Sequence, residues 1–491
     1  MDPVGHRCDT SRIDGVAVTD VEEVVAPQPA RVGKDRRQLP SWRWEELRTT
    51  LWVVPSILIV VSVLLFLVTF EIDLAAFHGH LTLPHWIRTG SADAERQVLI
   101  AIAAAVITVV GVVFSITILA LTLASQQFGP RMMRNFVRDI GNQVTLGVFV
   151  GTFVYSVLAL VSINSASQAF VPYLSTSVAE ALLMVDLVVL IYFIHHIAKS
   201  IQLPEVIAGI ARDLINSIDA EFPDAVGAAV DPAVPTRAGK SVPELLKLID
   251  ERGAVVPSQV SGYIQYVGYS QLIGIATRTD SVIRLEHRPG HYLATGRALA
   301  IVWPRGAAPE VARALSKAHV TGPHRTLVQD PVFAIDQLVE IAIRALSAAV
   351  NDTFTALTCI DWLSAGLGRV SGRVLDEGVY RDGAGNVRLI ESDPSYARMV
   401  NRAFDKIRQS ARGMPAVLIR LIDSLGSIML DTTSAEQRDV LRRQADMVLR
   451  LSEETVSEPN DLEEIRFRYQ RLPGEEAFAA QPHTWSKIDL P

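Results

Sequence analysis

The sequence is poor in features that mark several common classes of protein. It holds only two cysteines, Cys8 and Cys359, which lie far apart and have no neighbouring ligand cluster. This excludes a disulfide framework and a zinc site built from CxxC pairs. The formal net charge of -7 argues against a nucleic-acid partner, because such proteins normally carry a strong basic bias.

Motifs of familiar enzyme chemistry are also missing. The chain has no GxSxG, no P-loop, no HExxH and no GxGxxG after a strand. We therefore expect no enzymatic activity, no catalytic residue and no cofactor, and no motif indicates a small-molecule ligand. His78, His80 and His85 lie close together, but zinc spacings are absent and we expect no metal site.

Apolar sequence is what the chain has in abundance. About 20 consecutive apolar residues are enough to cross a bilayer as a helix. Four runs reach that length: Leu51–Phe70, Val98–Ala124, Val144–Ile163 and Val178–Ile197. They predict a polytopic protein whose four transmembrane helices contact the lipid bilayer.

The basic residues near these runs predict an orientation. Six of them precede the first run, and Arg131, Arg134 and Arg138 lie between the second and third, whereas residues 164–177 have none. The positive-inside rule then puts both termini in the cytoplasm, with the protein in the plasma membrane. The three arginines share one face of a short amphipathic segment, where we expect them to meet lipid headgroups.

Small and polar residues form a stripe along the second run. Steps of three, four and seven bring its members to one helical face: Ala101, Ala104, Thr108, Gly111, Ser115, Thr122 and Ser125. The third run carries Gly147 and Gly151 in the GxxxG arrangement. Tight helix packing at Gly111, Gly147 and Gly151 is one interpretation, because small residues let backbones approach. A pore lined by Thr108, Ser115 and Thr122 in a homo-oligomer is the other.

Two acids stand in the fourth run. Asp186 lies near its middle and Glu180 near its outer end. A charged acid at the bilayer centre costs about 3 kcal/mol on insertion scales, so Asp186 should face protein or water. It is either a neutral carboxyl bonded to a hydroxyl or an ion or proton site, and both interpretations remain open.

Two blocks of sequence carry a resemblance to a known family. The first runs from Ser125 through Gly129-Pro130-Arg131 to Tyr155, and the second from Ala345 to Ala356. Both are similar to a bacterial family of predicted membrane proteins, domain of unknown function 2254, over about Trp44 to Leu430. Ala348 and Thr353 stand where that family usually has proline. The resemblance implies a membrane protein and brings no activity, ligand or catalytic residue.

The part after the spans mixes strand and helix patterns. Short β-rich runs separated by turn residues lie between Ala254 and Trp303. The run Pro289–Leu299 looks like the hairpin of lipoyl- or biotinyl-type modules, which implies a small β-barrel, but no lysine stands at its tip. Later we expect two helices flanking Asn351-Asp352, a hairpin over Gly378–Ile390, and a salt-bridged helix face at Asp336, Glu340 and Arg344.

The fold class predicted is thus a four-helix α-helical membrane domain, then a cytoplasmic α+β region with a small β-barrel-like module and C-terminal helices. The expected divisions are a tail at 1–43, the membrane domain at 44–199, a connector at 200–252, a β-rich module at 253–305, a helical domain at 306–480 and a tail at 481–491. Our functional hypothesis is an oligomeric ion channel or transporter with a regulatory or assembly domain. The alternative is a membrane-anchored scaffold or sensor without transport.

Overall fold

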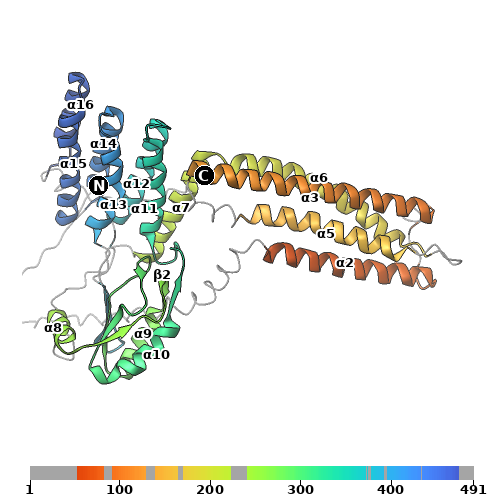
Figure 1. The fold of residues 1–491 in the computed structure, drawn as a ribbon, viewed down its shortest axis with the longest axis horizontal. Coiled ribbons are helices and arrows are strands. Elements are labelled where there is room, and N and C mark those ends of the chain that lie inside the picture. Colours follow the sequence, from red (N-terminus) through yellow and green to blue (C-terminus); the bar gives the residue numbers. More distant parts are fainter. Residues whose placement is uncertain are drawn as a thin grey trace, which may run out of the picture.

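The computed structural model describes residues 52–81, 84, 91–128, 139–163, 170–222, 240–371, 373, 378–391, 395–432 and 434–474. Four helices in it are long and apolar enough to cross a membrane, and each overlaps one of the four predicted runs. They are α2 (Val53–Phe77), α3 (Ala92–Phe128), α5 (Ile140–Ser162) and α6 (Tyr173–Ser200). Figure 1 shows them side by side as one elongated bundle, with the rest of the chain gathered at one end.

Helix α5 lies at the centre of this bundle. Its backbone comes close to α2, since a Cβ built on Gly147 would stand 3.0 Å from the Cα of Pro55, and one on Gly151 would stand 2.5 Å from the Ser62 hydroxyl. Large side chains such as Phe149, Tyr155 and Phe193 fill the interior. The outward faces of α2, α3 and α6 expose leucine, isoleucine, valine and phenylalanine, a surface suited to lipid rather than to water.

Strands from two distant parts of the chain form two open sheets. The larger has the order β1-β5-β3-β8-β7 and the smaller β4-β2-β6; β3 and β8 pair in parallel and the other pairs are antiparallel. Neither sheet closes into a barrel within the described residues. The strands are β1 (Ala254–Pro257), β2 (Gly262–Val267), β3 (Val282–Leu285), β4 (Tyr292–Leu293), β5 (Ala298–Trp303), β6 (His319–Gly322), β7 (Val379–Arg381) and β8 (Val387–Glu391).

Helices cover both faces of the five-stranded sheet. On one face α9 (Tyr269–Arg278) and α10 (Ala308–Ala318), the latter preceded by a 3-10 turn at Arg305–Ala307, pack on side chains such as Ile283. On the other face α8 (Val242–Arg252) packs on Val282 and its neighbours. Alternate residues of one strand therefore pack into two different hydrophobic cores, because successive side chains of a strand point to opposite faces of the sheet.

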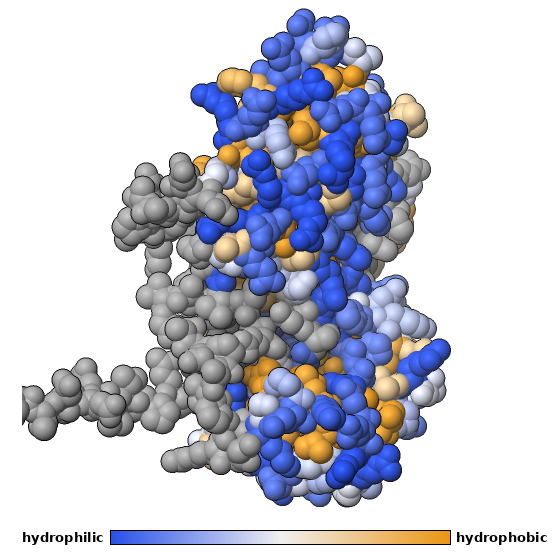
Figure 2. All heavy atoms as spheres, turned by 90° about the vertical axis from the view of Figure 1, so that its left-hand side faces the viewer, coloured by the Kyte–Doolittle hydropathy of each residue, from blue (hydrophilic) through white to orange (hydrophobic). Residues whose placement is uncertain are grey.

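The remaining helices surround the largest core. They are α7 (Leu203–Glu221), α11 (Pro331–Ala345), α12 (Thr353–Ser371), α13 (Tyr396–Ser410), α14 (Pro415–Asp431), α15 (Ala435–Thr455) and α16 (Pro459–Gln470). Helix α7 follows α6 after two residues and buries Ile207, Ile210, Leu214 and Ile218 in this core. Seen from the end opposite the apolar bundle, the surface is mostly hydrophilic with smaller apolar patches (Figure 2).

Several sequence expectations can be compared with these elements. The hairpin expected over Gly378–Ile390 is confirmed by β7 and β8. Asp352 accepts a hydrogen bond from the Thr355 amide and so begins α12. The expected ion-paired face on α11 needs correction for Asp336, which pairs with Arg325 and Arg402 from other segments. Residues 1–51, 129–138 and 475–491, with Arg131, Arg134 and Arg138, lie outside the described residues, as does His85.

Candidate functional site

Asp186 occupies the middle of α6 and points into the bundle. Its side chain is only 3% exposed. One carboxylate oxygen, Oδ1, accepts a hydrogen bond of 3.0 Å from the Thr152 hydroxyl of α5. The other, Oδ2, is buried and has no hydrogen-bond partner among the described residues. A buried carboxylate oxygen without a partner is costly, which makes this position unusual for a purely structural residue.

The hydrogen-bond donor to Asp186 comes from one face of α5. Thr152 and Ser156 stand one turn apart on it, both fully buried, and the Ser156 hydroxyl donates to the Thr152 carbonyl. Ser156 is therefore occupied with its own helix, and Thr152 is the hydroxyl that reaches Asp186. Further along the same helix, both polar atoms of the buried Asn142 side chain also lack a partner among the described residues.

The predicted pore stripe of α3 faces away from this site. Thr108, Ser115 and Thr122 are exposed, and each hydroxyl donates to a carbonyl of its own helix four residues earlier, at 2.7 to 2.9 Å. Nothing lies within 4 Å of a Cβ built on Gly111. Within one chain the structure thus does not bring the stripe and Asp186 together.

Glu180 lies on α6 six residues before Asp186, which is about 9 Å along a helix. It is exposed, and its charge is close enough to Glu95 of α3 to interact with it. Glu95 in turn hydrogen-bonds the side chain of Thr176. Glu180 therefore belongs to an acidic group at one end of α6, separate from Asp186.

Sequence reasoning missed a second buried acid, Asp73 of α2. Its carboxylate accepts hydrogen bonds of 2.9 Å from the amides of Leu174 and Ser175, and one of 2.8 Å from the Ser175 hydroxyl. It therefore caps α6 from another helix, satisfying amides that a helix start leaves open. The Ser175 hydroxyl continues to Thr69, which pairs with the Tyr155 hydroxyl at 2.8 Å.

A contact between Asp139 and His196 lies at the other end of the bundle. Asp139 accepts from the amide of Gly141 at the start of α5, and its second oxygen lies 2.7 Å from the Nε2 atom of His196 on α6. The His196 ring also stacks on Tyr192. Along α6 there are thus polar contacts at Ser175, at Asp186 and at His196, roughly 15 Å apart by helical rise.

The helices and strands that follow α6, from α7 to α16, are called the soluble part below, and they have their own buried charge cluster. Asp336 of α11 contacts both Arg325 and Arg402, and Arg325 also pairs with Asp330. Burial raises the pKa of Asp330, and the charge of Arg325 opposes that rise. This cluster ties the segment after β6 to α11 and α13, so it is structural. No group of three His, Cys, Asp or Glu side chains within the described ranges is placed to hold a metal ion.

The chain has four long apolar helices with a buried acid, and these are joined to a water-facing region of helices and sheets. These features define a predicted polytopic membrane protein. The chain belongs to the family described as predicted membrane protein (DUF2254), which matches residues 48–427.

Relatives of the chain are known from mycobacteria. It is similar to an uncharacterized protein of Mycobacterium bovis and to uncharacterized proteins of two Mycobacterium tuberculosis strains, H37Rv and CDC 1551. Each is 31% identical over 380 residues, which cover 76% of this chain and 71% of the relative. No solved structure shows a significant match.

Proposed function

We propose that this protein moves an ion or a proton across the membrane, as a channel or a transporter, and has no enzymatic activity. The observation that carries the proposal is the Oδ2 atom of Asp186, which is buried and unpartnered at the middle of α6. Ionisable residues at such a depth typically mark ion pathways or proton relays. Thr152 holds one oxygen and orients the carboxyl, so that the other is where a proton or cation is exchanged.

The connection of α6 to the soluble part supports a regulatory role for that part. Only Ile201 and Gln202 separate α6 from α7, and Lys199 pairs with Glu205 across this joint at 3.4 Å. Because α7 is buried in the core of the helical region, a shift of α6 is transmitted to that core. The soluble part thereby senses or gates the membrane part.

Assembly into a homo-oligomer is the second part of the proposal. The stripe of α3 presents Thr108, Gly111, Ser115 and Thr122 outward, with nothing close to Gly111. A small-residue face of this kind suits close contact with another apolar helix. A second copy of the chain meeting this face would bring the stripes of several copies together around a shared axis.

Placement in the plasma membrane with both termini in the cytoplasm completes the proposal. It rests on the distribution of lysine and arginine around the four helices. In this orientation Asp73 and Glu180 lie toward the outside and the Asp139–His196 pair toward the cytoplasm. Arg131, Arg134 and Arg138 then meet the anionic headgroups of the inner leaflet.

The proposal is tested by ion flux into liposomes that contain the purified full chain. We expect cation or proton flux for the wild type and its loss or a changed pH dependence for Asp186→Asn. Asp93→Asn is the matched control, because Asp93 is an exposed acid at the start of α3. Equal flux for the wild type and Asp186→Asn would remove Asp186 from the pathway.

A membrane-anchored scaffold or sensor is the alternative. The observation that favours it is the broad hydrophilic surface of the soluble part, which is large enough to hold a partner (Figure 2). In that case Asp186→Asn changes the stability of the bundle, and neither the wild type nor the variant moves ions. Absence of flux in liposomes holding correctly folded wild-type protein would support this alternative.

A further inference from the structure

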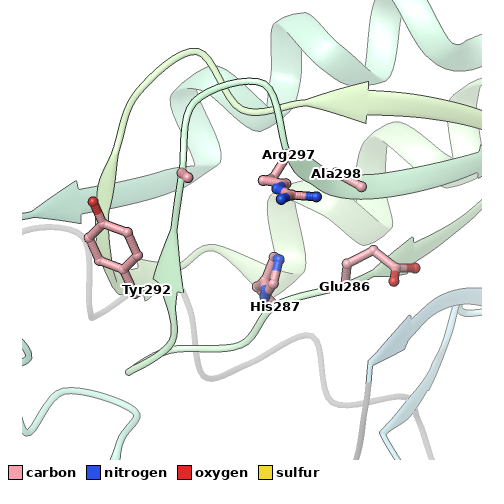
Figure 3. A pocket seen from close by; sticks show the side chains of 6 residues that line it. Glu286, His287, Tyr292, Arg297 and Ala298 are labelled. Carbon is pink, nitrogen blue, oxygen red and sulfur yellow. The ribbon is translucent and has the colours of Figure 1, made fainter.

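An open cavity lies beside the hairpin of β4 and β5, far along the chain from the membrane helices. Its volume is about 520 Å³, within the range of small-molecule sites, which is roughly 300–1,000 Å³. It is lined by Glu286, His287, Tyr292, Ala294, Arg297 and Ala298. Figure 3 shows its two ends, with Tyr292 on one side and Glu286 on the other.

Two basic side chains line this cavity. The Arg297 guanidinium and the His287 ring point toward the same space, whereas the Glu286 carboxylate points away from it (Figure 3). Glu286 accepts a hydrogen bond of 2.7 Å from the Nε atom of Arg284, which also pairs with Asp250. The Arg297 side chain is exposed and makes no hydrogen bond or ion pair with the residues that the structure describes. A guanidinium without a protein acceptor is thus available to a ligand.

Further basic residues lie next to His287. His287 lies against His291, with ring centroids 6.1 Å apart. The pKa of His291 is lowered to about 4, chiefly by burial and in addition by the charges of Arg288, His287, Arg398 and Arg325. The charges of Arg288 and Arg398 therefore act close to His291, beside the cavity, and favour an anionic ligand there.

We propose that the cavity binds a small organic phosphate, with the phosphoryl group on Arg297 and His287. The planar guanidinium of arginine matches two phosphate oxygens at once, which makes arginine a preferred phosphate ligand. Tyr292 is 57% exposed and supplies a flat apolar wall for the organic part. This site lies in the soluble part and does not depend on ion movement through the membrane helices.

The test is calorimetric titration of the full chain in lipid nanodiscs with adenosine monophosphate. We expect saturable binding by the wild type, weaker binding of inorganic phosphate and none of adenosine. Arg297→Gln should weaken binding by at least about tenfold, as expected for the loss of a charge-assisted hydrogen bond. Arg252→Gln is the matched control, since Arg252 is another exposed arginine at the end of α8 and should leave binding unchanged.

A second pair of variants addresses the tyrosine. Tyr292→Leu should weaken binding of adenosine monophosphate while leaving that of inorganic phosphate unchanged. Tyr292→Phe should bind adenosine monophosphate as the wild type does. Thermal unfolding of each variant checks that it is folded. The proposal is overturned if the wild type binds no phosphate compound with a Kd below about 1 mM. It is equally overturned if Arg297→Gln and Arg252→Gln bind alike, or if adenosine binds as well as its monophosphate.

Discussion

Replacing Gly147 by alanine should destabilise the membrane bundle, whereas the same change at Gly111 should not. A Cβ at Gly147 would stand 3.0 Å from the Pro55 Cα and 2.6 Å from the Leu58 Cδ1 atom, so reaching an ordinary contact of 3.4 Å requires shifts of 0.4 and 0.8 Å. The leucine can rotate, but the Pro55 Cα belongs to the backbone of α2. The two helices must therefore separate.

The expected magnitude follows from two opposing effects. Overpacking a close contact costs about 1–3 kcal/mol, and alanine in a helix gains about 0.5–1 kcal/mol over glycine. The net loss at Gly147 is then up to about 2.5 kcal/mol, while Gly111, with nothing within 4 Å, shows only the gain. The assay is reversible unfolding of both variants in a detergent that keeps the chain monomeric. Equal changes in unfolding free energy would refute this account of α2–α5 packing.

Three further predictions concern charged groups. Asp336→Ala should lower the unfolding free energy of the soluble part by about 3 kcal/mol. This is the low end for breaking a buried ion pair, because Arg325 keeps Asp330 as a partner. Denaturant unfolding checks this prediction. Stability should fall as pH drops from 6.5 toward 4, because His291 takes up its proton at a higher pH in the unfolded chain than in the folded one. His291→Gln should flatten this part of the pH profile of the unfolding midpoint. Asp139→Ala should cost about 1 kcal/mol through loss of the cap on the Gly141 amide, and Asp139→Asn should restore most of it in thermal unfolding.

The four apolar helices could be predicted from the sequence because each is a property of one continuous run. Hydrophobic length alone indicates a span, and the runs at Val98 and Val144 needed no knowledge of their neighbours. The cap that Asp73 forms on α6 could not be predicted in this way. It joins residues about 100 positions apart, and one acid just after an apolar run has no distinguishing pattern.

The sheet shows the same limit. Alternating apolar residues indicated strands near Gly262 and Ala298, but not that β3 pairs in parallel with β8, more than 100 residues later. That pairing brings the hairpin of β7 and β8 into an open sheet where a small barrel was expected. Strand partners depend on long-range packing, on which the period of a single strand carries no information.

For the candidate site, the sequence indicated which residue types are present but not whether their side chains face into the bundle or out of it. Helical spacing put Thr108, Ser115 and Thr122 on one face, and the structure adds that this face is turned outward while Asp186 is turned inward. The stripe and the acid were both visible as exceptions in apolar runs. Which neighbour each would meet depends on how α3 and α6 are rotated in the bundle, and hydropathy does not specify that.

Ion movement through the membrane part is the central claim, and current recording tests it most directly. The purified full chain is inserted in a planar bilayer and recorded with and without applied tension, beside Asp186→Asn and the Asp93→Asn control. We predict discrete openings in the wild type and in Asp93→Asn, with altered conductance or pH dependence in Asp186→Asn. A silent bilayer containing folded, monodisperse wild-type protein would contradict the claim and leave the scaffold or sensor as the better account.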